Sequence, residues 1–409
     1  MNTPHIVSLS ETLTRKSYGE SILIMQKNRS QITILVPLLF ALITIISPSI
    51  VTAQENLIPA PTGPYQIGTV SLYWKDETRD ESYTADTQDK RELMVQFWYP
   101  ADVMAGATSA PYMSNANAMA TAMTSAFARL RIKITLPDDF TQWQSHAFQN
   151  VPISDHEVKY PVLIFSHGYG NFLGLYSTQL EEMASQGYIV VGITHTYGSL
   201  LTVFPDGRQI PWQDTVHDDT TLRELQELWS ADQIFVLDQL EMINKLDVDS
   251  LFAGRLDLEH LGIFGHSAGG AAAAQTCYVD SRCQVGIDED GGVLTKVAEK
   301  GLNKPFMFIR TDDFPGNNAS LFKQLSGPAY SLAFHGFQHM NLTDIPLWPG
   351  TDAVRYAGLF KKLDGRRSTE IKNAYFLAFF NHYLKGEDEP LLNGATPDYP
   401  EVFFESRNT

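Results

Sequence analysis

Short apolar segments alternate with polar and helical stretches through residues 54–409. Two early segments alternate between apolar and polar positions, as strands buried on one face do. Six later segments are continuous and rich in β-branched or aromatic residues, which is typical of strands buried on both faces of a sheet. The expected strands are Gly68–Trp74, Leu93–Tyr99, Val162–Phe165, Ile189–Ile193, Leu261–Phe264, Val285–Ile287, Phe306–Ile309 and Tyr330–Phe334.

Helical patterns lie between these strands. They are expected at Ser177–Ser185, Thr221–Asn244, in a short stretch after Ser267 and at Thr369–Leu384. Strands that alternate with helices predict an α/β fold with a mostly parallel central sheet of about eight strands, flanked by helices. No internal repeat or low-complexity linker divides residues 54–409, so one domain is expected.

Residues 104–157 interrupt this alternation, because they contain no clear strand. Within them Met119, Met123 and Phe127 are spaced by four residues and would form one stripe of a helix. Such a stripe can pack onto the core of the domain. Alternatively, this segment is a cap-like insertion that acts as a lid or lipid-facing flap, where flexible methionine side chains suit an acyl chain.

An uncharged apolar stretch, residues 32–47, precedes the domain. Lys27 and Arg29 come before it, and small residues follow it up to Ala53. A basic region, an apolar region and a small-residue cleavage site are the parts of a secretory signal peptide. Residues 25–53 are therefore predicted to be a signal peptide that is cut after Ala53.

Residues 1–24 are polar and unpatterned, and we interpret them as an over-long N-terminal extension. An uncleaved membrane anchor is the alternative to cleavage, but sixteen apolar residues are few for a membrane span. The mature chain is thus predicted to be secreted or periplasmic, with no transmembrane span.

The composition is that of a globular protein, with 44% hydrophobic and 19% charged residues. The formal net charge of −17 repels phosphate backbones, so no nucleic-acid partner is expected. Two cysteines are too few for an all-cysteine zinc site. In an exported chain Cys277 and Cys283 can form a disulfide across a turn, and a pair of free buried thiols is the alternative.

The stretch LGIFGHSAGG contains the strongest candidate for catalysis. It combines an apolar strand, a G-x-S-x-G pattern at residues 265–269 and an alanine-rich run. A serine in a sharp turn between strand and helix needs glycine two positions away on each side, because larger side chains would collide there. The pentapeptide alone also occurs by chance, but its place after a buried strand makes Ser267 the expected nucleophile.

A serine nucleophile needs a histidine to take its proton and a carboxylate to orient that histidine. Three histidines follow Ser267 in the chain. His382 lies in the predicted C-terminal helix, and His335 ends a strand. His339 lies in the loop after the last predicted strand, where the base of such a hydrolase is found, so it is the expected base.

Two groups of carboxylates are candidates for the orienting acid. Asp288, Glu289 and Asp290 end one predicted strand, and Asp312 and Asp313 end the next. Both groups belong to the sheet edge that carries the nucleophile. The pattern by itself does not choose between them.

The segment Ser166-His167-Gly168-Tyr169-Gly170 follows the strand VLIF. A His-Gly turn at this place directs a backbone N–H toward the nucleophile, and the second N–H comes from the residue after the serine. Tyr169 and Ala268 are therefore the expected oxyanion hole, through their backbones alone. His167 is expected to support the turn.

Several separated blocks resemble the plasma-type platelet-activating factor acetylhydrolases, which are serine-dependent, calcium-independent phospholipases of the α/β-hydrolase fold. The blocks, within residues 92–390, are VQFWYPAD, YPVLIFSHGYGNFLGLYS, LDLEHLGIFGHSAGG, VGIDEDGG, GFQHMNLTD and IKNAYFLAFFNHYL. The resemblance implies Asp290 as the acid. The Ala/Met-rich segment is not part of it, and Asp312 and Asp313 lie where related esterases and polyester hydrolases keep their acid.

The resemblance implies a secreted serine esterase that removes a short or oxidised sn-2 acyl group from phospholipids, as in 1-alkyl-2-acetylglycerophosphocholine, through an acyl-enzyme. Ser267, His339 and Asp290 would form its triad, and Tyr169 and Ala268 its oxyanion hole. No metal or organic cofactor is expected. The alternative is a general carboxylesterase or polyester hydrolase, similar to dienelactone hydrolases or cutinases. A small-molecule or lipid ester, met at a lipid interface, is the expected partner, and the oligomeric state stays open.

Overall fold

The computed structural model describes residues 58–409 except 130, 132–133, 246–249, 314–317 and 352–362. The predicted signal peptide and the N-terminal extension lie outside these described residues. The described residues belong to one compact unit. Within the described ranges, no helix is both long and apolar enough to cross a membrane.

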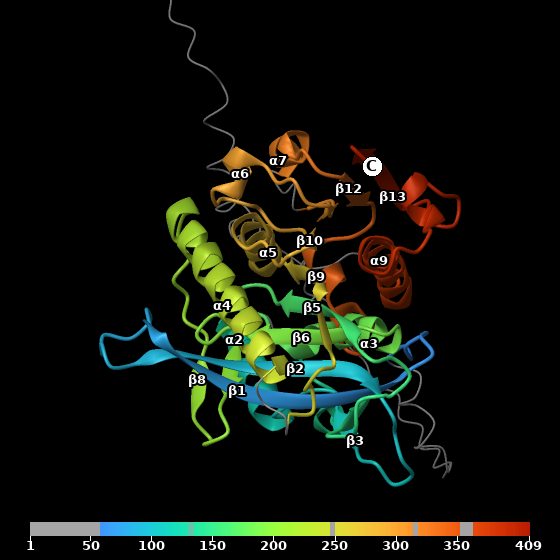
Figure 1. Ribbon diagram of the computed structural model, residues 1–409. Helices are drawn as coiled ribbons and strands as arrows, with labels where there is room; N and C mark the ends of the chain where they lie inside the picture. The colour runs from blue at the N-terminus through green and yellow to red at the C-terminus, as the bar shows by residue number, and fades with distance from the viewer. Residues whose placement is uncertain (1–57, 130, 132–133, 246–249, 314–317, 352–362) are drawn as a thin grey trace, which may run out of the picture. The chain divides into compact units, whose positions relative to one another are not determined.

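An eleven-stranded sheet forms the centre of the unit, in the order β13-β12-β11-β10-β9-β5-β6-β2-β1-β4-β3 (Figure 1). Its strands are β1 (Gln66–Asp80), β2 (Lys90–Ala101), β3 (Ser109–Pro111), β4 (Gln144–Gln149), β5 (Tyr160–Ser166), β6 (Ile189–Thr194), β9 (Leu256–His266), β10 (Val285–Glu289), β11 (Phe306–Arg310), β12 (Ala329–Phe334) and β13 (Val402–Arg407). From β12 to β6 neighbouring strands run parallel, and β13 and β2 flank them antiparallel. All eight expected strands are present, and the predicted fold class is confirmed.

Helices cover both faces of this sheet. The α-helices are α2 (Ala116–Arg129), α3 (Ser177–Ser185), α4 (Asp219–Lys245), α5 (Ala268–Val279), α6 (Val297–Lys300), α7 (Asn318–Gln324) and α9 (Gly365–Phe380). Shorter turns are η1 (Phe140–Gln142), η2 (Leu173–Tyr176), η3 (His339–Leu342), η4 (Ile345–Leu347), η5 (Asn381–Lys385) and η6 (Pro390–Asn393), and β7 (Leu201–Val203) and β8 (Gln209–Pro211) form a separate hairpin.

Two large apolar clusters fill the space between sheet and helices, and a smaller one lies between α4 and α5. Ile263 and Phe264, adjacent in β9, belong to opposite clusters because successive side chains of a strand alternate between its faces. The Phe264 cluster includes α3 and α9, and the Ile263 cluster includes α4 and α5. In Figure 1 these helix pairs lie on opposite sides of the sheet.

The expectation that residues 104–157 contain no clear strand is wrong. β3 and β4 lie within the segment, and β4 pairs with β1, so that the two strands extend the sheet. They escape pattern analysis because β3 has only three residues, and β4 (QSHAFQ) has only Ala147 buried. Helix α2 follows the predicted stripe, with Met119 and Met123 buried in the core.

Residues on both sides of α2 contact Asp344 and Trp348, in a turn that follows β12. The Tyr112 hydroxyl donates a hydrogen bond to Asp344 Oδ2 at 2.9 Å and accepts one from Trp348 Nε1 at 3.1 Å. Phe140 and Trp143, which follow α2, pack edge-on against Trp348 at 5.2 and 6.4 Å between ring centroids. Contacts on both sides of α2 therefore fasten the segment to the body of the protein.

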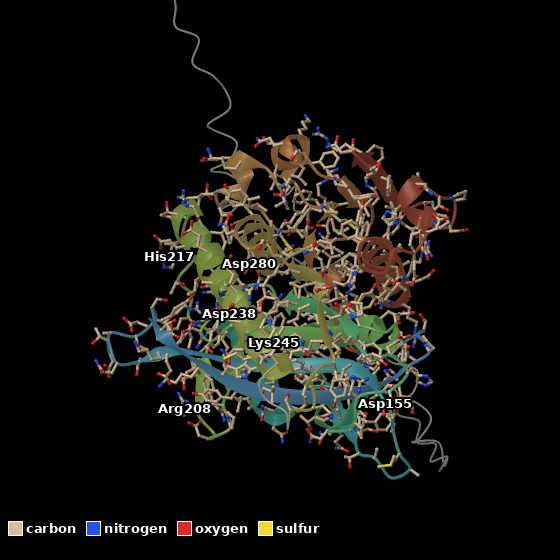
Figure 2. The ribbon with its side chains drawn as sticks, viewed as in Figure 1. Asp155, Arg208, His217, Asp238, Lys245 and Asp280 are labelled. Atoms are coloured by element: carbon tan, nitrogen blue, oxygen red, sulfur yellow. A yellow bond between two sulfur atoms is a disulfide. The ribbon has the colours of Figure 1, made fainter. Side chains whose placement is uncertain are left out.

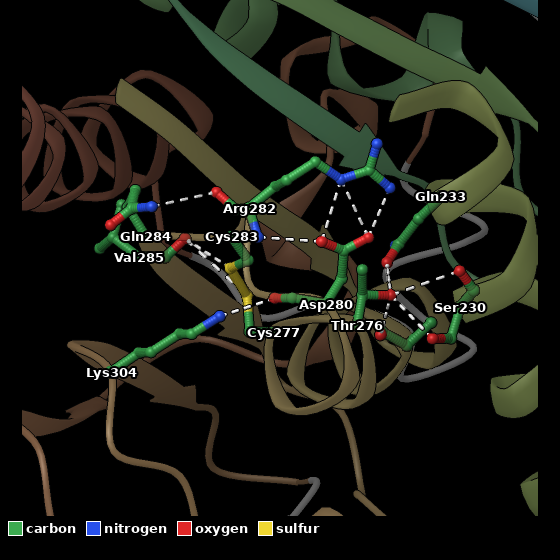
Figure 3. Close-up of a disulfide and its surroundings, with 11 residues drawn as sticks. Ser230, Gln233, Thr276, Cys277, Asp280, Arg282, Cys283, Gln284, Val285 and Lys304 are labelled. Carbon is green, nitrogen blue, oxygen red and sulfur yellow. Dashed lines mark hydrogen bonds and ion pairs between the residues drawn. A yellow bond between two sulfur atoms is a disulfide. The ribbon is translucent and has the colours of Figure 1, made fainter. Parts of the chain in front are cut away.

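A disulfide joins Cys277, in the last turn of α5, to Cys283, just before β10 (Figure 3). Both side chains are fully buried. Arg282, between them, pairs with Asp280 at 2.6 Å, and Lys304 Nζ donates to the Asp280 carbonyl. The disulfide thus closes the connection from the helix after the candidate nucleophile to the strand before the candidate acids.

Charged side chains gather on the outside of the helices and loops (Figure 2). The side chains of Asp155, Asp238 and Lys245 are 88%, 58% and 67% exposed. Their ion pairs are solvated and contribute little to stability.

Candidate active site

Ser267 lies at the turn between β9 and α5, with φ 56° and ψ −123°. A positive φ is strained for a residue other than glycine, and such strain collects at functional sites. A Cβ on Gly265 or Gly269 would approach the Ser166 carbonyl oxygen to 2.5 or 2.2 Å. The end of β5 is thus packed directly against the turn, which is why glycine is required at both positions.

His339 and Asp290 meet at the same edge of the sheet. His339 Nδ1 is 2.7 Å from Asp290 Oδ2, and the Asp290 side chain is fully buried. Asp290 follows β10 with φ 60°, and it also accepts hydrogen bonds from the Thr311 amide at 2.8 Å and the Thr311 hydroxyl at 2.7 Å. Because a carboxylate oxygen accepts hydrogen bonds, Nδ1 of His339 is the donor in this contact.

The other candidate acids have different partners. Asp312 Oδ1 is 3.2 Å from His335 Nδ1, and Asp312 Oδ2 accepts from the Gly336 amide. Asp313 Oδ1 accepts the backbone N–H of His339 at 2.9 Å. The structure therefore brings Asp290 to the imidazole of His339 and Asp313 to its backbone.

The expected oxyanion turn passes beside the nucleophile. A Cβ placed on Gly168 would lie 3.3 Å from Ser267 Cβ. Among the described residues, no protein acceptor takes the N–H of Tyr169 or that of Ala268. Ala268 begins α5, where the positive end of the helix dipole also favours a negative charge.

Hydrogen bonds of His167 and Tyr169 hold this turn in place. His167 Nδ1 is 2.8 Å from the Gly168 carbonyl, and His167 Nε2 accepts the backbone N–H of His195 at 3.3 Å. Burial lowers the pKa of His167 to about 3, so it stays neutral in this supporting position. The Tyr169 hydroxyl donates to the Gln213 carbonyl at 2.7 Å and accepts from the Thr215 amide at 2.6 Å.

An apolar pocket of about 450 Å³ adjoins the site. It is lined on one side by Tyr169 and Gly170 of the oxyanion turn and by Met340, which follows the candidate base. Further walls come from α2 and from aromatic side chains: Met123, Ala126, Phe127, Phe172, Trp212 and Trp348. Arg129, at the end of α2, adds a positive charge to this lining.

Two more carboxylates beside Asp290 are fully buried. Burial raises the pKa of Asp288 to about 8 and that of Glu289 to about 7. Gln179 Nε2 donates to Glu289 Oε1 at 2.7 Å, and Lys372 partly offsets the effect of burial on Glu289. Within the described ranges, no group of three or more His, Cys, Asp and Glu side chains is arranged to hold a metal ion.

Thr311 and Asp313 are site residues that sequence analysis did not assign to these positions. Thr311 carries no signal, because its contribution is a backbone N–H and a hydroxyl aimed at Asp290. Asp313 was considered only as the acid, whereas its carboxylate binds the backbone of the base.

Comparison with known proteins assigns this chain to a family. The sequence model of the family described as "Platelet-activating factor acetylhydrolase, isoform II" matches residues 50–208 and 221–393. The chain belongs to this family. The family predicted from the sequence blocks is thereby confirmed. Ser267, Asp290 and His339 lie in the second matched range, and Tyr169 lies in the first.

Curated relatives of this acetylhydrolase family are distant. The platelet-activating factor acetylhydrolase of Cavia porcellus is 28% identical over 282 residues, which cover 59% of this chain and 64% of the relative. A probable 1-alkyl-2-acetylglycerophosphocholine esterase of Arthroderma benhamiae is 26% identical over 266 residues, which cover 60% and 66%. The chain therefore spans slightly less than two thirds of each relative's length.

A solved structure, the ferulic acid esterase from Streptomyces cinnamoneus, superposes with a TM-score of 0.72 at 27% identity. It covers 85% of this chain, and 98% of the esterase is covered in return. The fold of this acetylhydrolase-family chain is thus an α/β-hydrolase fold.

Proposed function

We propose that this chain is a serine-dependent carboxylic ester hydrolase. The observation that carries the proposal is the 2.7 Å contact between His339 Nδ1 and the buried carboxylate of Asp290, at the sheet edge where Ser267 occupies a strained turn. Acyl transfer by a serine hydrolase needs a histidine base that a buried carboxylate orients, and this contact supports that role for His339 and Asp290.

In the proposed reaction Ser267 Oγ attacks the ester carbonyl carbon while His339 Nε2 takes the hydroxyl proton. The imidazolium is stabilised by Asp290, and the Tyr169 and Ala268 amides stabilise the oxyanion. His339 then returns the proton to the departing alcohol, leaving an acyl-enzyme on Ser267. Water, deprotonated by the same histidine, cleaves that ester and releases the acid.

We propose phospholipids with a short or oxidised sn-2 acyl group as the substrates. The family and the names of the relatives support this class. The apolar pocket offers a place for a lipid tail, and Arg129 offers a positive charge that a phosphodiester can pair with. We also propose that residues 25–53 direct the chain to an extracytoplasmic compartment, where the Cys277–Cys283 disulfide is stable.

A second candidate is a general carboxylesterase. It is favoured by the likeness to a ferulic acid esterase and by the aromatic walls of the pocket, which suit an aryl acyl group as well as an alkyl chain.

The test compares the purified protein with its Ser267→Ala variant. Release of acetate and of palmitate is followed from matched sn-2-acetyl and sn-2-palmitoyl phosphatidylcholines, with EDTA present. Preferential acetate release that vanishes in the variant supports the phospholipid proposal. Cleavage of aryl esters alone, dependent on Ser267, supports the general carboxylesterase. Absence of any Ser267-dependent hydrolysis contradicts both.

A further inference from the structure

A chain of buried hydrogen bonds runs behind the candidate nucleophile. The Tyr176 hydroxyl accepts hydrogen bonds from the Gly168 amide at 3.2 Å and from Asn171 Nδ2 at 2.9 Å, and it lies 2.8 Å from His266 Nδ1. His266 Nε2 lies 3.2 Å from the backbone carbonyl oxygen of His339. The chain therefore connects the oxyanion turn, the residue before the nucleophile and the loop of the base.

The direction of each hydrogen bond follows from the chemistry of the groups. A phenol oxygen accepts at most two hydrogen bonds and donates one. Gly168 and Asn171 supply N–H groups and take both acceptor positions, so Tyr176 must donate its proton to His266 Nδ1. The carbonyl of His339 can only accept, so His266 carries its own proton on Nε2. One tautomer of His266 satisfies every group in the chain.

Close packing leaves this chain little freedom. Tyr176 and His266 are fully buried, and a Cβ on Gly168 would approach His266 Nδ1 to 2.9 Å. The rings of His266 and His339 lie 4.3 Å apart between centroids. Burial, together with the neighbouring His339, holds the pKa of His266 well below its usual range. An uncharged ring therefore contacts the imidazole that becomes positive during the proposed reaction.

We propose that Tyr176 and His266 are positioning residues for the ester hydrolysis proposed above, on which this inference rests. Tyr176 selects the Nε2–H tautomer of His266 and at the same time holds the Gly168 turn. His266 then holds the backbone of His339, so that the oxyanion turn and the base are set relative to Ser267 by one connected element. Both residues act through the backbone of the oxyanion turn and of His339.

The test compares Tyr176→Phe with Tyr188→Phe. Tyr188 is equally buried, and its hydroxyl hydrogen-bonds Asn381 Oδ1 at 2.8 Å, so the control also removes one buried hydroxyl contact. We expect Tyr176→Phe to lower kcat on an aryl acetate about 10- to 100-fold, the cost of slight misplacement of reacting groups, with little change in KM. The phosphonylation rate of Ser267 by a fluorophosphonate should fall in parallel. Tyr188→Phe should leave both rates unchanged.

A second variant covers the case in which Tyr176→Phe fails to fold. His266→Gln keeps an N–H donor for the His339 carbonyl but has no nitrogen at the Nδ1 position to accept from Tyr176, and we expect a similar loss of kcat. In the double variant the losses should not add, because both substitutions break the same connection. Additive losses, or a loss in Tyr176→Phe no larger than in Tyr188→Phe, would overturn the proposal.

The tautomer itself gives a readout that needs no turnover. In ¹⁵N-histidine-labelled protein, the His266 signal, assigned by its absence in His266→Gln, should show an unprotonated Nδ1 and a protonated Nε2, and Tyr176→Phe should change this pattern. A protonated Nδ1 in the unsubstituted protein contradicts the hydrogen-bond direction. If no ester is cleaved but the tautomer is as stated, the proposed function fails while the connected element stands.

Discussion

Replacing Asp290 by asparagine exchanges one carboxylate oxygen for an NH₂ group at nearly constant volume. In the structure Asp290 Oδ1 accepts the Thr311 amide at 2.8 Å, and Oδ2 faces the Thr311 hydroxyl and His339 Nδ1, both at 2.7 Å. The Thr311 amide can only donate, so it fixes the oxygen of the new asparagine at the Oδ1 position. The NH₂ group is then directed at His339 Nδ1, which must accept from it.

An imidazole that accepts at Nδ1 carries its proton on Nε2 and cannot take the proton of Ser267. Forcing the wrong tautomer in a Ser-His-Asp triad costs about 10⁴-fold in kcat. This corresponds to about 5 kcal/mol of lost transition-state stabilisation. The fold should tolerate Asp290→Asn, because the hydroxyl of Thr311 can rotate to accept from the new amide.

The measurement is kcat on an aryl acetate for Asp290→Asn, Asp312→Asn and Asp313→Asn, with thermal unfolding as the control for folding. Asp312→Asn should have a smaller effect than Asp290→Asn, since Asp312 contacts the side chain of His335 and the Gly336 amide. Asp313→Asn should cause an intermediate loss through the backbone of His339. A larger loss in either variant than in Asp290→Asn would refute the reasoning.

Three further predictions concern stability and substrate range. The folded pKa of Glu289, about 7, lies above its unfolded value, so the free energy of unfolding should fall as pH rises from about 4.5 to 7, by up to about 1.4 kcal/mol per pH unit. Denaturant unfolding of Glu289→Gln should show a weaker dependence on pH across this range, and an unchanged pH dependence would contradict the raised pKa of Glu289. Replacing both Cys277 and Cys283 by alanine should lower the free energy of unfolding by about 2 kcal/mol, because the disulfide closes a short loop, and should leave activity at saturating substrate unchanged. Loss of activity in a variant that stays folded would show that the disulfide also positions the active site. Ala126→Trp should fill the pocket and lower the rate of hydrolysis of a decanoate ester about 10-fold relative to that of an acetate ester, whereas Ala128→Trp, on the exposed side of α2, should not. The same ratio of decanoate to acetate hydrolysis in both variants would exclude the pocket from acyl binding.

The sequence predicts those parts of the fold in which a local pattern reports burial. Residues 261–264 of β9 and 306–309 of β11 are continuous apolar runs because they are covered on both faces, and the pattern predicts them. β13 was missed because its sequence, VFFESR, is an edge strand in which only Val402 is buried and Phe403 is exposed. A continuous apolar run therefore predicts a central strand, whereas an edge strand has no such run and is missed.

The turn at Ser267 could be predicted because it requires glycine two positions away on each side, and the sequence shows glycine at both positions. The connected element of Tyr176 and His266 could not, because its two residues are 90 positions apart and no pattern in the sequence shows that their side chains meet. The preference for Asp290 over Asp312 came from the family resemblance and not from the pattern. In the structure Asp290 reaches His339 from a backbone conformation with positive φ, and no spacing of residues in the sequence specifies that conformation.

The contacts that attach residues 104–157 to the body of the protein affect which parts of it can change in evolution. Tyr112 before α2, and Phe140 and Trp143 after it, attach the segment to Trp348 and Asp344, whereas α2 between them supplies walls of the pocket. The residues that keep the segment in place are thus separate from many that shape the pocket. A different helix could be exchanged between the same anchors without altering the central sheet or the residues around Ser267. Substrate range can then evolve independently of the chemistry, by replacement of one exchangeable part.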